Sequence, residues 1–173
     1  MEDVLDILKY TIPSLVLFIT VYFIVRAFYK NEARRRDYEI RRKNQRITTP
    51  IRLQAYERIT LFLERLSPDS MIMRVQKPGM TCKQLQGELL STIRAEFEHN
   101  LSQQIYITPK TWEVVRSAKE STVKLINTSG DEVNPDGPAI ELSKTILEKV
   151  MDAQKAPSQV AIEFIKKEMV EFF

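Results

Sequence analysis

The sequence predicts an all-α protein with one N-terminal transmembrane helix, a basic juxtamembrane helix and a cytoplasmic bundle of about five helices. Three observations lead to this fold class. Residues 10–25 contain no charged side chain, whereas residues 26–46 contain nine Lys and Arg against three acidic side chains. From residue 50 onward, apolar side chains recur at the three- and four-residue spacing of helices. Only four glycines occur in 173 residues, which disfavours a sandwich or barrel with many tight turns.

The first element, residues 10–29, has the length and composition of a membrane-spanning helix. Its apolar run is about 20 residues long, which matches a hydrocarbon core of about 30 Å. A helix would hold Tyr10 and Tyr29 about 28 Å apart, one near each membrane interface. A cleaved signal peptide and a buried core helix are the alternatives. The acidic character of residues 1–9 disfavours the signal peptide, and the lack of a polar face disfavours the core helix.

The basic residues that follow the apolar run predict its orientation. Positively charged flanks stay on the cytoplasmic side of a membrane. We therefore expect residues 1–9 to form a short translocated tail and residues 50–173 to form a cytoplasmic domain at the inner membrane. A basic helix over residues 30–49 is expected between the membrane and this domain.

This basic helix has several possible roles. The simplest is that it only fixes topology. A second is contact with a partner or with anionic lipid headgroups, through Arg34, Arg35, Arg36, Arg41, Arg42, Lys43 and Arg46. Nucleic-acid binding is disfavoured, because no aromatic-rich platform accompanies the basic run. A weak heptad seam in residues 33–51 leaves a parallel homodimer open; its members are Ala33, Asp37, Ile40, Asn44, Ile47 and Ile51.

Five amphipathic helices are expected in residues 50–173. The first begins at Pro50 and ends at Ser67-Pro68, and the second begins at Thr81, where Thr81 and Gln84 form a capping box. The third begins at Thr108-Pro109 and ends at Ser129-Gly130. The fourth follows Pro138, and the fifth follows the break at Ala156-Pro157. Two short apolar stretches, 71–75 and 105–107, are read as a short strand or docked loop and as a β-branched segment.

A search for chemistry yields no expected catalytic residue, metal site or cofactor. Cys82 and His99 are the only residues of their kinds. They lie about 25 Å apart along one predicted helix, too far for a nucleophile and its base. Residues 132–137 resemble the start of a calcium loop, but Ser143 stands where the bidentate Glu is needed. No glycine-rich phosphate loop is present. Trp112, Met71 and Met73 are read as core residues rather than cofactor contacts.

Two apolar stretches nevertheless look unusual for a loop and for a chain end. They are Met71, Ile72 and Met73, and the terminal Phe172 and Phe173. Each is either part of the core or a contact surface for a protein partner. We expect partner contact at these five residues as the hypothesis to be tested.

The stretches RLQAYERITLFLERLSP and TWEVVRSAKE, after one N-terminal span, resemble a family of uncharacterised small single-pass inner-membrane proteins of Bacteroidota-type bacteria. The resemblance implies an inner-membrane location and no particular activity. Together these observations predict a non-enzymatic protein whose cytoplasmic domain binds protein partners, as an accessory or scaffold subunit of a membrane complex. The alternative is a membrane tether that binds anionic lipid or nucleic acid through residues 30–46.

Overall fold

The computed structural model describes the backbone of residues 2–172 and the side chains of residues 15–170. Contacts within the chain divide it into two units, residues 1–49 and residues 50–173. Each unit is described by itself below.

All regular structure in the described residues is helical, which confirms the predicted all-α class. The elements, in chain order, are α1 (Glu2–Leu66), α2 (Pro68–Val75), α3 (Cys82–Asn100), the 3₁₀ helix η1 (Leu101–Ile105), α4 (Pro109–Gly130), α5 (Ala139–Asp152) and α6 (Pro157–Phe172). The only β-type pairing among these residues is an isolated antiparallel bridge between Thr81 and Pro138.

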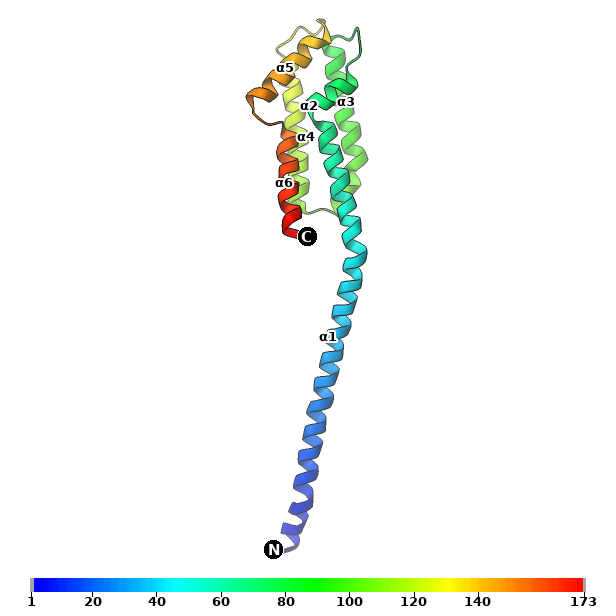
Figure 1. Cartoon of the computed structure of the whole chain (residues 1–173), viewed down its shortest axis with the longest axis vertical. Helices are drawn as coiled ribbons and strands as arrows, with labels where there is room; N and C mark the ends of the chain where they lie inside the picture. The colour runs from blue at the N-terminus through cyan, green and yellow to red at the C-terminus, as the bar shows by residue number, and fades with distance from the viewer. Residues whose placement is uncertain (1, 173) are drawn as a thin grey trace. The chain divides into compact units, whose positions relative to one another are not determined.

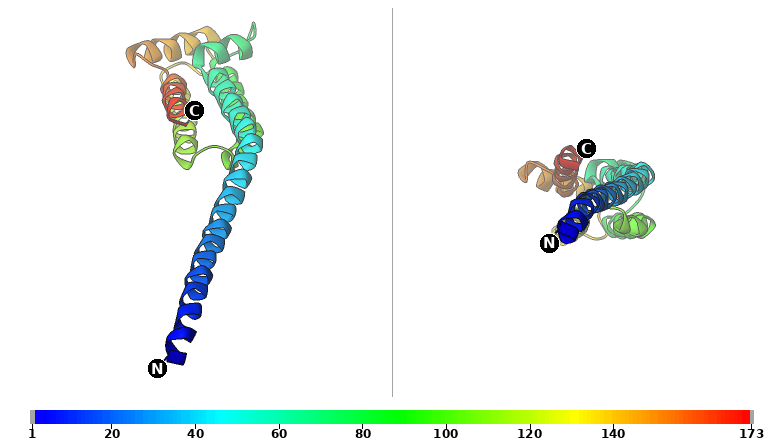
Figure 2. Two further views of the ribbon diagram at one scale, coloured as in Figure 1. Left: turned by 60° about the horizontal axis from the view of Figure 1, so that its bottom comes forward. Right: turned by 90° about the horizontal axis from the view of Figure 1, so that it is seen from below.

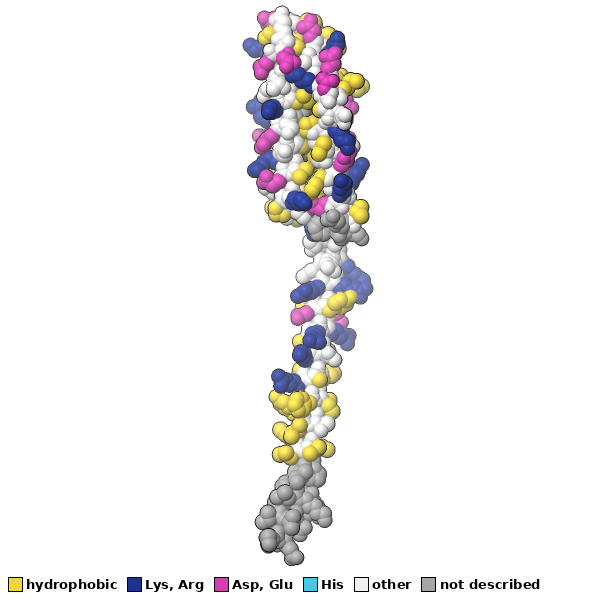
Figure 3. Space-filling model, turned by 90° about the vertical axis from the view of Figure 1, so that its left-hand side faces the viewer, with side chains coloured by type: hydrophobic (Ala, Val, Ile, Leu, Met, Phe, Trp, Pro, Cys, Tyr) yellow, Lys and Arg dark blue, Asp and Glu magenta, His cyan; other side chains and the backbone are white. Residues whose placement is uncertain are grey.

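The first unit consists of the N-terminal part of α1. Its large apolar side chains between residues 15 and 29 are all exposed, by 44% to 70%. Figure 3 shows these hydrophobic side chains gathered along one stretch of the helix, with Lys and Arg predominating beyond it. Within the described residues, no helix has a stretch both long and apolar enough to cross a membrane, so the predicted transmembrane helix is not supported. Residues 1–14, which include the predicted tail and the start of the predicted span, lie outside the described side chains.

The second unit is a helical bundle built around one apolar core. The part of α1 from residue 50 onward runs alongside α3, α4 and α6, while α2 and α5 lie across one end of these helices (Figures 1 and 2). Every α-helix of this unit contributes buried apolar side chains to the core. Those of α1 are Ala55, Tyr56, Ile59, Phe62, Leu63 and Leu66, all at most 3% exposed. The spacing of these residues confirms the apolar face predicted for residues 50–66.

The predicted starts of α3 and α4 are confirmed by their hydrogen bonds. Thr81 Oγ1 accepts a bond from the Gln84 backbone N–H, and Gln84 Oε1 accepts one from the Thr81 N–H, which completes the capping box. Thr108 Oγ1 accepts a bond from the Thr111 N–H, with Pro109 as the first helical residue of α4. These side chains satisfy backbone donors that the first turn of a helix leaves without a partner.

Three details of the fold differ from the sequence prediction. Helix α1 continues through Pro50, so no new helix begins at that residue. Residues 71–75 belong to helix α2 and form neither a strand nor a loop; Pro68 at its first position and Asp69 and Arg74 at its two ends are typical of a short helix. Residues 101–105 form the 3₁₀ helix η1, and the apolar stretch at 105–107 pairs with no strand.

Candidate functional site

A groove with a volume of about 710 Å³ lies at the end of the bundle where α2 and α5 meet. One wall comes from the end of α2 and the connection to α3, residues 72–81, and the other from residues 136–140 at the start of α5. We call it the loop groove. Met73 on the first wall is 86% exposed, and Ile140 on the second is 61% exposed. The loop groove therefore has an apolar lip on each wall.

Backbone hydrogen bonds hold the two walls of the loop groove together. The N–H groups of Cys82 and Lys83 donate to the carbonyls of Gly137 and Pro135, both at 2.9 Å, and the Ala139 N–H donates to the Met80 carbonyl at 3.0 Å. The bonds of Cys82 and Lys83 use donors in the first turn of α3, which has no helical acceptor for them. The walls are thus fixed by the backbone rather than by flexible side chains.

Side chains reinforce this arrangement beneath the loop groove. The buried Cys82 thiol donates to the Pro138 carbonyl at 3.2 Å. The hydroxyl of Ser143 donates to Gln76 Oε1 at 2.8 Å, which ties α5 to the residue after α2. The connection turns at Gly79, whose φ of +81° is accessible to glycine at no steric cost.

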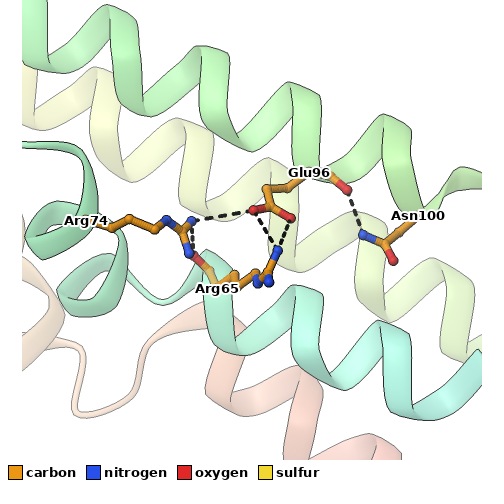
Figure 4. Close-up of polar contacts among 4 residues, drawn as sticks. All are labelled: Arg65, Arg74, Glu96 and Asn100. Atoms are coloured by element: carbon orange, nitrogen blue, oxygen red, sulfur yellow. Dashed lines mark hydrogen bonds and ion pairs between the residues drawn. The ribbon is translucent and has the colours of Figure 1, made fainter.

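Helix α2, which carries Met73, is fixed to the bundle by a polar cluster of four residues (Figure 4). Arg74 Nη2 donates to the Arg65 carbonyl at 3.4 Å, near the C-terminal end of α1, where carbonyls lack helical partners. Glu96 on α3 accepts bonds from Arg65 Nη1 at 3.3 Å and lies 3.7 Å from Arg74 Nη2. The buried Asn100 amide donates to the Glu96 carbonyl at 2.8 Å. One carboxylate therefore joins three helices.

The three residues at 71–73 that were predicted to contact a partner differ in burial. Met71 is 1% exposed and Ile72 is 6% exposed, whereas Met73 is 86% exposed. They lie on a helix, so successive side chains point 100° apart and only one of the three faces outward. Only Met73 is placed for contact with a partner. Phe172 and Phe173, the other predicted contacts, lie outside the described side chains.

The basic segment that was predicted to contact anionic lipid is exposed throughout. Arg35 forms an ion pair with Glu39 at 3.0 Å, and Arg36 forms one with Glu32 at 3.3 Å. Among the described residues, the remaining cations of the predicted set have no ion pair; they are Arg34, Arg41, Arg42, Lys43 and Arg46. These five charges are available to an anionic ligand.

A buried polar cluster joins α1, α4 and α6. Glu168 is 8% exposed, and its carboxylate accepts hydrogen bonds from Tyr56 at 2.7 Å, Thr108 at 2.8 Å and Thr111 at 2.5 Å. Burial raises the pKa of Glu168, but these three bonds and the charge of Lys110 outweigh it, so the pKa lies below its usual value. Burial and the bond to Glu168 raise the pKa of Tyr56. The carboxylate is thus held ionised, with its oxygens occupied by donors.

The other residues that were considered for catalysis or metal binding do not come together in the structure. Cys82 lies beneath the loop groove, whereas His99 lines two smaller grooves beside Arg65 and Glu96. In the calcium-like loop, Glu132 pairs with Lys149 at 2.8 Å, and Asn134 Oδ1 accepts a bond from the Asp136 N–H. Among the described residues, no group of three His, Cys, Asp or Glu side chains is placed to hold a metal ion.

Sequence reasoning did not identify the loop groove or the Glu168 cluster. Both bring together residues that are far apart in the chain: Met80 bonds to Ala139, and Tyr56 bonds to Glu168. The one local signal was the cap at Thr108, which correctly placed one member of the cluster at a helix start.

The model of a family of unknown function, DUF7935, matches residues 2–172. No curated protein and no solved structure matches the chain.

Proposed function

Since the chain belongs to this family of unknown function, we propose from its own geometry that it is a single-pass membrane protein that acts by binding a protein partner. Residues 10–29 anchor it in the inner membrane of a Bacteroidota-type bacterium, and residues 50–173 face the cytoplasm. It serves there as an accessory or scaffold subunit of a membrane complex, without catalysis of its own.

The apolar lip of the loop groove is the observation that carries the partner-binding role. Met73 and Ile140 present large apolar side chains to solvent from two walls that backbone hydrogen bonds hold in place. Covering apolar surface is worth about 25 cal/mol per Å². Because the walls are already fixed, a partner loses little free energy in ordering them. Methionine also adapts to irregular partner surfaces.

The exposed apolar side chains of the first unit support the anchoring role. Leu17, Phe18 and Phe23 are 68%, 70% and 59% exposed, and they lie on different sides of the helix. A helix that is apolar all round is stable when lipid or protein surrounds it. The nine Lys and Arg in residues 26–46 favour retention of that flank on the cytoplasmic side.

The partner-binding role is tested by co-purification after mild detergent extraction of the full chain. The double variant Met73→Asp, Ile140→Asp places two charges on the lip of the loop groove. The control variant Met151→Asp, Val160→Asp makes the same change at two exposed apolar side chains outside it, 77% and 53% exposed. We expect a stoichiometric partner with the wild type and the control, but not with the loop-groove variant. A partner kept by all three, or lost from both variants, would contradict this role.

The anchor is tested independently by extraction at alkaline pH and by a reporter fused after Phe173. We expect the chain to stay in the membrane pellet and a reporter active only in the cytoplasm to be active. Release into the supernatant would refute the anchor, and an inactive reporter on a stable fusion would refute the topology.

The second candidate function is a tether that binds anionic lipid or nucleic acid through residues 30–46. The five exposed cations without an ion pair among the described residues favour it. In the co-purification experiment, lipid or nucleic acid without a protein partner would support this function in place of the first.

A further inference from the structure

The positive charge of the basic helix extends farther from the proposed anchor than anionic headgroups reach. The first unit is helical without interruption from residue 2 to residue 49. A helix rises about 1.5 Å per residue, so Arg34 lies about 8 Å beyond Tyr29, Arg41 about 18 Å and Arg46 about 26 Å. These lengths matter because the proposed anchor, residues 10–29, ends at Tyr29.

Anionic headgroups reach only the beginning of this helix. The interfacial layer on each side of a bilayer is about 5–8 Å thick, and the Debye length at physiological salt is about 8 Å. Arg34 lies within reach of the headgroups under these conditions. Arg41, Lys43 and Arg46 lie beyond the sum of the interfacial layer and one Debye length, about 16 Å. An anionic group that pairs with these three side chains would therefore come from a ligand other than lipid.

The distribution of side chains around the helix defines the face that such a ligand would contact. Ile40 and Ile47, 58% and 59% exposed, lie seven residues apart on one face together with Ala33, Asp37 and Asn44. We call this face the seam. In the heptad pattern that it follows, the positions flanking the seam are occupied by Arg34, Arg36, Arg41 and Lys43. Every flanking position in this stretch is basic.

The flanking charges argue against a second copy of the chain. In a parallel pair, Arg36 of one helix would face Arg41 of the other, and like charges at these positions disfavour pairing. An antiparallel pair brings basic flanks together as well. A partner helix with acidic residues at its own flanking positions instead forms ion pairs at each of them.

We propose that the seam of residues 33–47 docks an acidic amphipathic helix of a protein partner. The apolar positions of that helix cover Ile40 and Ile47, and its Asp and Glu pair with Arg34, Arg41 and Lys43. This deepens the proposed function and rests on it for the position of the membrane surface. Asn44 and Asp37 on the seam favour a polar residue and a basic residue, respectively, at the facing positions.

The probe is a labelled synthetic helix with Leu at its apolar seam positions, Glu at the flanking positions, and Asn and Lys facing Asn44 and Asp37. A peptide of the same composition with the seam order scrambled is the first control. Binding to the full chain in phosphatidylcholine nanodiscs is measured by fluorescence anisotropy. We expect the ordered peptide to bind at least tenfold more tightly than the scrambled one.

Two charge-reversal variants distinguish specific binding at the seam from general electrostatic attraction between the basic helix and the acidic peptide. Arg41→Glu with Lys43→Glu changes the flanking positions, whereas Arg42→Glu with Arg46→Glu makes the same net change on other faces of the same helix. We expect the first to weaken binding at least tenfold and the second less than threefold. Equal losses in the two variants, or no preference for the ordered peptide, would overturn the proposal.

Two further experiments test the other possible occupants of the seam, which are lipid headgroups and a second copy of the chain. Nanodiscs that contain 30% phosphatidylserine should weaken peptide binding less than threefold; abolished binding would assign the charges to the headgroups. An Ile47→Cys variant should give no disulfide-linked dimer on oxidation; an efficient dimer would assign the seam to a second copy. Flotation of the chain with the nanodisc lipids tests the anchor separately. If the chain does not float with the lipids, peptide binding measured in detergent micelles still tests the seam.

Discussion

The hydroxyl of Tyr56 donates a 2.7 Å hydrogen bond to Glu168, 112 residues later in the chain, and thereby joins the first helix of the bundle to the last. Thr108 and Thr111 donate to the same carboxylate from the start of α4. An ionised group near the N-terminus of a helix also benefits from the helix dipole. The cluster thus ties together three helices at one end of the bundle, whereas the loop groove lies at the end formed by α2 and α5.

Removal of the Tyr56 hydroxyl should destabilise the bundle. In a fragment of residues 50–173, which contains the whole second unit, we expect Tyr56→Phe to lower the free energy of unfolding by about 1.5–3 kcal/mol, the usual range for a hydrogen bond to a charged group. Tyr106→Phe, at a tyrosine 39% exposed, is the control and should change it by less than about 0.5 kcal/mol. Urea unfolding at pH 7 measures both. Equal effects of the two variants would show that the cluster adds no stability.

The lowered pKa of Glu168 makes the bundle sensitive to acid. A carboxyl group whose pKa is lower in the folded state than in the unfolded state stabilises the fold above the unfolded value, and this stabilisation is lost as the pH falls through the folded value. The ordinary pKa of a glutamate carboxyl group is 4.5. We expect the stability difference between the wild type and Glu168→Gln to be constant from pH 7 to about pH 5 and to shrink below about pH 4.5. A difference that grows in acid would contradict the ionised assignment.

A charge introduced at Met71 should destabilise the bundle strongly, whereas a charge introduced at Met73 should leave its stability nearly unchanged. Met71→Asp places a carboxylate in the core, which costs several kcal/mol or forces the group to take up a proton. Met73→Asp changes a side chain that is 86% exposed and should alter the free energy of unfolding by less than about 0.5 kcal/mol. Thermal melts followed by circular dichroism compare them. A destabilised Met73→Asp variant would show that this residue packs in the core.

The cap at Thr81 stabilises the start of α3 beside the loop groove. We expect Thr81→Ala to lower the free energy of unfolding by about 1 kcal/mol, because the Gln84 N–H then loses its acceptor. Thr81→Ser retains the oxygen and should restore most of this loss. If serine destabilises as much as alanine, the cap hydrogen bond is not the cause.

The local signals of the sequence predicted most helix boundaries, but they predicted neither the loop groove nor the Glu168 cluster. Caps at Thr81 and Thr108 and the break before Pro157 act within one helical turn, so neighbouring residues suffice to identify them. Helix α2 was missed because its apolar run at 71–73 obscured the signals of Pro68 and Arg74 at its ends.

The loop groove and the Glu168 cluster depend instead on contacts between distant residues. A sequence pattern shows that Met71 and Met73 are apolar, but only the packing of α2 decides which of them is buried. Glu168 likewise looks like an ordinary surface carboxylate until Tyr56 and Thr111 are brought to it by the fold. No periodicity in one helix carries that information.

The central claim is that the apolar lip of the loop groove contacts a protein partner in the cell. The most direct measurement is photo-crosslinking from a light-activated residue placed at Met73 in the full chain, with the same residue at Met151 as the control. Both methionines are exposed, by 86% and 77%, and only Met73 lines the loop groove. We predict one discrete crosslinked protein from position 73 that is lost in the Ile140→Asp background and is not formed from position 151. No crosslink from position 73, or the same product from both positions, would contradict the account.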